Sequence, residues 1–295
     1  GNQMLYGDAV SRLQVLNNTF RAEVKKSNCA AIDWLLIGDT AVIAGNDIYM
    51  TAEASDNLNY QALYFRPNNY QDKEKAVLYI VNNAIYATHG STYASYAVNL
   101  NSNLPKLLVA HNTIVLNAEG TAASPVYIQS APVAGSLFVN NIIQASGKGY
   151  AIRYKNAGSI ANTAFRHNIL YTPEATFGMP TANISTFADW KTAVGATDTD
   201  GNLNEAVTFA SATLLIPKET NDGHLLTAEM MASVTTDITG KTRAAAPTIG
   251  AYEYDADLFR VPVIAEGYPT ANTQDTKAGI IIKADNYGTA KVLVL

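Results

Sequence analysis

Val81-Asn82-Asn83-Ala84-Ile85 is one of six short phrases in which an asparagine separates two apolar, strand-like segments. The other five phrases read Leu16-Asn17-Asn18-Thr19-Phe20, Ala44-Gly45-Asn46-Asp47-Ile48, Ala110-His111-Asn112-Thr113-Ile114, Val139-Asn140-Asn141-Ile142-Ile143 and Arg166-His167-Asn168-Ile169-Leu170. When the phrases are aligned, the shared asparagines are Asn18, Asn46, Asn83, Asn112, Asn141 and Asn168. Their spacings of 28, 37, 29, 29 and 27 residues indicate an internal repeat.

The residues that flank each asparagine support the alignment. Large apolar residues stand two positions after it in every phrase, namely Phe20, Ile48, Ile85, Ile114, Ile143 and Leu170. The residues three positions before it are Val15, Ile43, Ile80, Val109, Phe138 and Phe165. Since only 48% of the chain is hydrophobic, chance does not explain twelve apolar positions. Short alternating segments rich in β-branched residues are typical of strands.

Several repeats contain a further strand-like run earlier in the period, at residues 62–65, 97–100, 125–128 and 151–154. Three short strands in each period of nearly thirty residues fit one coil of a parallel β-helix. We therefore expect an all-β fold, with residues 2–171 forming a right-handed parallel β-helix of about six coils.

The repeated asparagine has a structural explanation. A sharp bend between strands needs a residue that tolerates left-handed backbone angles, and asparagine does so better than most residues. Coils stack at about 4.8 Å, which lets identical amides hydrogen-bond from one coil to the next. We therefore interpret the six asparagines as a buried ladder. The long interval between Asn46 and Asn83 predicts a loop insertion at 56–59 or 68–75.

Composition excludes several classes of protein. The formal net charge of −5 does not favour a nucleic-acid partner, which would require a basic face. The apolar runs are far shorter than the roughly 18–20 residues of a membrane span. Cys29 is the only cysteine, so no internal disulfide forms, and no phosphate-loop, dinucleotide-binding or zinc motif appears.

The repeat ends after Tyr171. Residues 186–193 predict a short helix that Ser185 or Thr186 caps, with Phe187 and Trp190 packing inward. Further on stand the phrases DITGKTR, at 237–243, and PTIGAYEY, at 247–254. Together with the asparagine ladder, they resemble the C-terminal closure of secreted bacterial pectate-lyase-like β-helix proteins of the variable-anchor class. The resemblance spans roughly residues 2–254 and implies architecture more than catalysis.

The last forty residues form a separate segment. Strand-like runs at 278–285 and 290–295 flank a turn at Asn286-Tyr287-Gly288. This pattern is similar to the first strands of a fibronectin-III-like sandwich, which needs about seven strands. We expect a domain at 1–255, with its closure at 171–255, and the beginning of a truncated sandwich at 256–295. The chain also looks as if it starts inside a coil, which adds weight to an interpretation with further coils upstream and leaves their presence open.

Proteins of the pectate-lyase-like class bind sugar chains along one sheet, and here side-chain alternation predicts which residues face outward. The candidate glycan-binding residues are Asp33, Tyr64, Arg66, Asn99, Asn101, Tyr127, Gln129, Arg153 and Lys155. Aromatic rings stack on sugars, amides bond to hydroxyls, and Arg or Lys hold uronate or sulfate groups. An ordinary solvated sheet face, or a face covered by loops, explains the same residues equally well.

No catalytic residues can be assigned. A pectate-lyase-type elimination would use Ca²⁺ held by several carboxylates, and glycoside hydrolysis would use two carboxylates about 5–10 Å apart. Asp33 has no acidic neighbour in the repeat, and Asp56, Asp72 and Glu74 lie in the expected insertions. We predict no metal site or cofactor, since the sequence does not support Ca²⁺. His89 is expected in a loop.

The resemblance thus implies a bacterial protein, secreted or on the outer cell surface, that contacts polysaccharide. It would act by binding, or as a polysaccharide lyase or glycoside hydrolase on acidic glycans. The alternatives are a non-catalytic adhesin or structural stalk, and an enzyme whose catalytic coils precede residue 1. The glycan, the linkage and the oligomeric state stay open, because function inferred from fold is analogy.

Overall fold

The computed structural model describes residues 3–7, 12–25, 27–35, 39–52, 60–66, 75–89, 94–174, 177–179, 182–211, 214–220, 226–255, 270–274 and 277–281. The chain divides into two compact units, residues 1–253 and 254–295. Both expected insertion sites lie almost wholly outside the described residues. None of the helices in the described ranges is long and apolar enough to cross a membrane.

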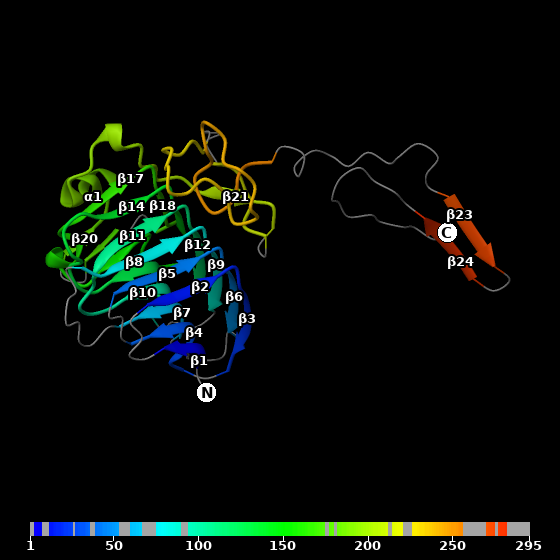
Figure 1. Cartoon of the computed structure of the whole chain (residues 1–295), viewed down its shortest axis with the longest axis horizontal. Helices are drawn as coiled ribbons and strands as arrows, with labels where there is room; N and C mark the ends of the chain where they lie inside the picture. Colours follow the sequence, from blue (N-terminus) through cyan, green and yellow to red (C-terminus); the bar gives the residue numbers. More distant parts are fainter. Residues whose placement is uncertain are drawn as a thin grey trace. The chain divides into compact units, whose positions relative to one another are not determined.

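The first unit is built on a parallel β-helix, in which the strands of successive coils line up to form three sheets (Figure 1). The first sheet contains, in order, β1 (Gln3–Gly7), β4 (Cys29–Trp34), β7 (Tyr60–Phe65), β10 (Tyr96–Leu100), β13 (Ser124–Ile128), β16 (Arg153–Tyr154), β19 (Phe177–Met179) and β20 (Ala182–Ile184). The second contains β2 (Leu13–Leu16), β5 (Thr40–Ala44), β8 (Val77–Val81), β11 (Lys106–Ala110), β14 (Ser136–Val139) and β17 (Thr163–Arg166). The third contains β3 (Thr19–Val24), β6 (Asp47–Ala52), β9 (Ala84–His89), β12 (Thr113–Ala118), β15 (Ile142–Ala145) and β18 (Ile169–Tyr171).

Every strand of these sheets pairs in parallel with its neighbours, except that β19 and β20 are antiparallel. The coils superimpose in register, so that Val15, Ile43 and Ile80 align in the second sheet. Of the twelve apolar positions that flank the asparagines, eleven are buried, and Phe20 in the first coil is half-buried. The predicted repeat and core are therefore confirmed.

The asparagine ladder is continuous. Each asparagine donates its backbone N–H and its Nδ2 to the Oδ1 of the asparagine in the next coil, at 2.8–3.1 Å. From Asn46 onward, each Nδ2 also donates to a carbonyl of the preceding coil, at 2.7–2.9 Å. The five asparagines from Asn46 to Asn168 are fully buried. Pairing every donor in this way avoids the cost of burying a free amide.

The left-handed residue of each bend is not the ladder asparagine, so that prediction was wrong. The residues directly before it have φ angles of 50–68°, namely Asn17, Gly45, Asn82, His111, Asn140, His167 and Gly201. Glycine and asparagine adopt this left-handed conformation most readily, and histidine is also enriched in it. At Gly45 a Cβ atom would lie 2.1 Å from the Asn17 Oδ1, so a larger residue there would have to displace the Asn17 side chain.

The ladder has a seventh member that the sequence repeat did not reveal. Asn168 donates to the Oδ1 of Asn202 at 3.0 and 3.1 Å, and Ile169 forms a parallel bridge with Leu203. The interval of 34 residues and the absence of a long flanking strand hid this coil. The pair Gly201-Asn202, which has the same form as Gly45-Asn46, was the available signal.

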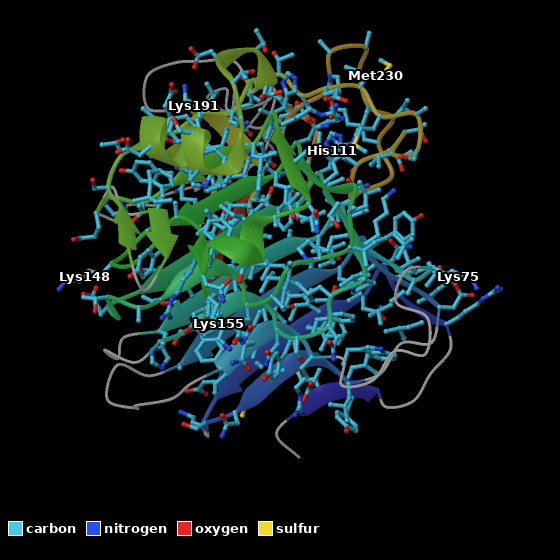
Figure 2. The ribbon with its side chains drawn as sticks, turned by 90° about the vertical axis from the view of Figure 1, so that its left-hand side faces the viewer. Lys75, His111, Lys148, Lys155, Lys191 and Met230 are labelled. Atoms are coloured by element: carbon cyan, nitrogen blue, oxygen red, sulfur yellow. The ribbon has the colours of Figure 1, made fainter. Side chains whose placement is uncertain are left out.

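Helix α1 (Phe187–Val194) closes the C-terminal end of the core, as Figure 2 shows for the region of Lys191. The Thr186 hydroxyl caps the helix by accepting the Asp189 N–H, and Gly195 ends it in the left-handed conformation. Trp190 is fully buried, with its ring centre 5.4 Å from that of Phe165, and its Nε1 donates to the Tyr154 hydroxyl. The predicted helix, cap and inward packing of Trp190 are confirmed.

Residues 226–253, here called the closing segment, pack along the flank of the third sheet (Figure 1). Leu226, Ala228 and Ile249 join Ile142 and Ile169 in a small apolar cluster. The phrases 237–243 and 247–254 meet through Arg243 and Glu253, which form a buried ion pair at 2.6 Å. The closing segment therefore covers a side of the coil, whereas α1 covers its end.

Shorter elements join these parts: η1 (Ala157–Ile160), η2 (Asp198–Asp200) and the antiparallel pair β21 (Val207–Phe209) and β22 (Pro217–Thr220). In the second unit, β23 (Thr270–Gln274) pairs antiparallel with β24 (Lys277–Ile281). Strand β24 overlaps the expected run at 278–285, whereas the expected run at 290–295 lies outside the described residues.

Candidate functional site

The sheet register aligns the predicted glycan-binding residues in two columns on the outer side of the first sheet. The first column consists of direct register partners on consecutive strands, namely Asp33, Tyr64, Asn99, Tyr127 and Arg153. The residues of the second column each follow a strand and donate a backbone N–H to a carbonyl of the preceding coil at 2.8–3.0 Å; they are Arg66, Asn101, Gln129 and Lys155. We call these nine residues the polar face.

Asp33 and Arg66 form an ion pair with two hydrogen bonds within the polar face. The Nε and a terminal nitrogen of Arg66 donate to the two oxygens of Asp33 at 3.0 and 2.9 Å. Asp33 is only 2% exposed, and the guanidinium lies 5.1 Å from the centre of the Tyr64 ring. These hydrogen bonds raise the pKa of Arg66. The positive charge of Arg66 compensates the negative charge of the Asp33 carboxylate. Because both carboxylate oxygens already accept hydrogen bonds from Arg66, Asp33 is poorly placed for proton transfer.

The amides of the polar face are also bonded to their neighbours. Gln129 Nε2 donates to the Oδ1 of Asn99 at 2.8 Å, and Asn101 Nδ2 donates to the Tyr64 hydroxyl at 3.0 Å. Asn99 and Tyr127 are 3% and 9% exposed, so a ligand would not reach them easily. Tyr64, Arg66, Asn101, Gln129 and Arg153 are half-buried, and Lys155 is exposed.

Arg153 lies in a cage of three tyrosine rings. Its guanidinium carbon is 4.7 Å from the ring centre of Tyr127, 5.7 Å from Tyr96 and 5.6 Å from Tyr150. One terminal nitrogen donates to the Tyr96 hydroxyl and to the Ala122 carbonyl, at 2.5 and 2.8 Å. Burial raises the pKa of Tyr96 to about 12. The cage holds the cation in place by cation–π contacts and a charge-assisted hydrogen bond.

Sequence reasoning missed Tyr96 because strict alternation puts it on the same side as Val98. Ala97 and Val98, however, are both buried in the core, so the alternation breaks between them. Tyr96 consequently packs against the Tyr127 ring, with 4.6 Å between ring centres. Tyr150 precedes its strand and carried no repeat signal. The sequence did contain one signal for this break in alternation. At the same point of three strands, an alanine directly precedes a large apolar residue, namely in Ala31-Ile32, Ala62-Leu63 and Ala97-Val98.

The remaining predicted residues lie elsewhere. Asp56, Asp72 and Glu74 fall outside the described residues. His89 ends strand β9 rather than occupying a loop, and its ring packs 5.4 Å from that of Tyr60. Within the described ranges no three side chains of His, Cys, Asp or Glu cluster as metal ligands would.

The polar face carries a local excess of positive charge. Its three cations, Arg66, Arg153 and Lys155, and its one carboxylate, Asp33, give the polar face a net charge of +2. The formal net charge of the whole chain is −5.

Comparisons with protein-family models, curated protein sequences and solved structures found no match for this chain. The fold and its buried ladder define a parallel β-helix protein with stacked asparagines.

Proposed function

We propose that this chain is a secreted or cell-surface protein of the pectate-lyase-like class, and that its polar face binds acidic polysaccharide. The observation that carries the proposal is the local excess of positive charge. Asp33 is neutralised by Arg66, so Arg153 and Lys155 remain as cations beside half-buried amide and phenol groups. Cations of this kind pair with uronate or sulfate, and the amides suit sugar hydroxyls.

A catalytic role has less support. Asp33 is the only carboxylate among the nine residues of the polar face, and both of its oxygens accept hydrogen bonds from Arg66. Glycoside hydrolysis by the usual route needs two carboxylates that flank the scissile bond. We therefore propose binding as the main activity, with lyase or hydrolase action on acidic glycans as the second candidate.

A non-catalytic adhesin or stalk is favoured by a different observation. The polar face satisfies many of its own groups through the Asp33–Arg66, Gln129–Asn99 and Asn101–Tyr64 contacts. A surface of this kind is stable without a ligand. The ladder and stacked coils would then serve as a rigid support.

The test is a glycan array that includes uronic-acid polymers and uncharged polymers, combined with assays for new reducing ends and unsaturated products. We expect binding to the acidic polymers that weakens with salt, since screening reduces exposed charge interactions. Lys155→Ala and Arg153→Gln should each weaken binding by about tenfold or more, as expected for a lost charged hydrogen bond.

Lys106→Ala is the matched control, because Lys106 is an exposed lysine at the start of β11 on the second sheet. Its removal should leave the affinity unchanged. Equal losses for Lys155→Ala and Lys106→Ala would show only non-specific attraction. Absence of both binding and turnover would favour the adhesin or stalk.

A further inference from the structure

The charges of the polar face are distributed unevenly along the first sheet. Asp33 on β4 accepts hydrogen bonds from Arg66, which follows β7, through both of its oxygens, so the two charges at this end compensate each other. Arg153 on β16 and Lys155, which follows that strand, lie three strands beyond β7 in the sheet order. Because neighbouring strands lie about 4.8 Å apart, about 14 Å separates the two groups of charges. The excess positive charge therefore belongs to the Arg153 end alone.

Arg153 and Lys155 together form a site for one anionic group. Within the described ranges neither cation has an ion-pair partner. They stand two residues apart on the same side of the sheet, which corresponds to about 7 Å along the chain. The tyrosine cage holds the Arg153 guanidinium, whose hydrogen bonds to Tyr96 and Ala122 use only one of its terminal nitrogens. A side chain that is already held in place loses little freedom when a ligand binds. Lys155 is exposed (Figure 2).

The middle of the polar face is neutral. Its accessible groups are the half-buried Tyr64, Asn101 and Gln129, because Asn99 and Tyr127 are almost fully buried. The amide nitrogens of Asn101 and Gln129 donate within the face, to the Tyr64 hydroxyl and the Asn99 Oδ1. Among the described residues, none donates to the side-chain oxygen of Asn101 or Gln129. These oxygens suit the hydroxyl donors of a neutral sugar, whereas an ionised carboxylate is only an acceptor and faces them unfavourably.

We propose, as a refinement that rests on the polysaccharide binding proposed above, that the polar face takes a glycan with one anionic sugar next to neutral sugars. The anionic group lies against Arg153 and Lys155, toward the end of the β-helix that α1 covers. The neutral sugars lie over Gln129, Asn101 and Tyr64. The ligand thus has a defined orientation as well as a defined position of its charge.

A polymer with an anion on every sugar fits this surface less well. The charges beyond the first would lie over amide oxygens, which repel them, and the next would approach Arg66, whose cation Asp33 already compensates. A face suited to such a polymer would repeat its cations along the second column of the polar face. The two middle positions of that column are amides, Asn101 and Gln129.

Matched tetrasaccharides test this charge pattern. Tetrasaccharides of glucose, galactose and mannose are each prepared in three forms: neutral, with one terminal sugar oxidised to its uronic acid, and with all four sugars oxidised. The one-acid form is made with the acid at either end, as separate samples. Isothermal titration calorimetry measures their affinities for the full chain. Where a backbone binds, the one-acid form should bind about tenfold or more tightly than the neutral form, as for a charged hydrogen bond gained. It should also bind at least as tightly as the four-acid form.

Three results would contradict the proposal. A four-acid form that binds more tightly than the one-acid form overturns the single-anion pattern and leaves polysaccharide binding standing. A neutral form that binds as tightly as the one-acid form overturns the anion site at Arg153 and Lys155. Absence of binding by every acidic form overturns both the pattern and the function on which it rests.

Variants locate the two parts of the site. Lys155→Ala should remove most of the preference for the one-acid form over the neutral form, whereas Lys106→Ala, an exposed lysine on the second sheet, should leave that preference as it is. Asn101→Lys adds a cation to the neutral middle and should raise the affinity for the four-acid form about tenfold relative to the one-acid form. Thermal unfolding shows that each variant is folded. If folded Asn101→Lys gains nothing for the four-acid form, the assignment of neutral sugars to the middle is overturned.

Discussion

At the scale of single residues, two neighbouring positions of each bend have different structural roles. The first adopts the left-handed backbone, and the second supplies the amide that joins the coils. Asn82 and Asn83 therefore have different roles despite their identical chemistry. Asn82 faces outward and bonds to the Thr236 carbonyl, whereas Asn83 is fully buried and bonds within the ladder.

The buried amides should be costly to remove. In Asn112→Leu, the backbone N–H and Nδ2 of Asn83 lose their acceptor. Because each buried unpaired group costs about 1–3 kcal/mol, the free energy of unfolding should fall by roughly 2–5 kcal/mol. Urea unfolding followed by circular dichroism measures the change. Asn18→Leu, at the exposed end of the ladder, should cost less than about 1 kcal/mol, and similar losses for both variants would contradict the ladder as a buried network.

His111 makes stability depend on pH. It is fully buried, and its Nε2 lies 2.8 Å from the Asn140 Nδ2, so it accepts a hydrogen bond as a neutral ring. Burial, and then the charge of Arg243, lower the pKa of His111 from 6.5 to about 3. The unfolded chain binds a proton below pH 6.5 while the folded chain does not. Stability is therefore complete above pH 6.5 and falls as the pH drops toward 3.

His111→Asn tests this dependence, since asparagine occupies the same left-handed position in three other bends, at Asn17, Asn82 and Asn140. The unmodified protein should lose up to about 1.4 kcal/mol for each pH unit below 6.5 through this group. The variant should lack that contribution. Urea titrations between pH 4 and 8 compare the two slopes, and parallel curves would show that His111 does not set the dependence.

At the scale of elements, the closing segment is attached through polar anchors. Asn140 bonds to both the carbonyl and the N–H of Glu229, and Arg243 reaches the Asn82 Oδ1 at 2.8 Å. Asp237 accepts the N–H groups of Thr239, Lys241 and Glu253. The outward side chains of the bends thus serve as attachment points for a segment far away in sequence.

Breaking the buried ion pair should release this segment. Arg243→Met leaves the Glu253 carboxylate buried without its cation, which typically costs about 3–5 kcal/mol. Limited proteolysis and hydrogen exchange should show faster cleavage and exchange at 226–253 while the ladder stays protected. The double variant Arg243→Met with Glu253→Gln should recover part of the stability. Equal loss of protection throughout the first unit would indicate global unfolding instead.

At the scale of the whole molecule, the sequence revealed the stacking of the coils but not the side-chain contacts between them. The coils were predictable because stacking requires every coil to place the same kind of residue at the same position, and such periodicity is visible in one sequence. The polar face followed from that register. The contacts within it did not, because the Asp33–Arg66 pair and the tyrosine cage around Arg153 depend on side-chain conformations across coils.

The sequence by itself determined the coil period, the inward and outward sides of most strands, and the capping helix with Trp190. Only the tertiary structure identified which residue adopts the left-handed bend, the seventh ladder member Asn202, and the place of Tyr96 beside Arg153. It also placed the closing segment on the flank of the third sheet. The physical reason is that local periodicity encodes stacking, whereas single long-range contacts leave no repeated signal in the chain.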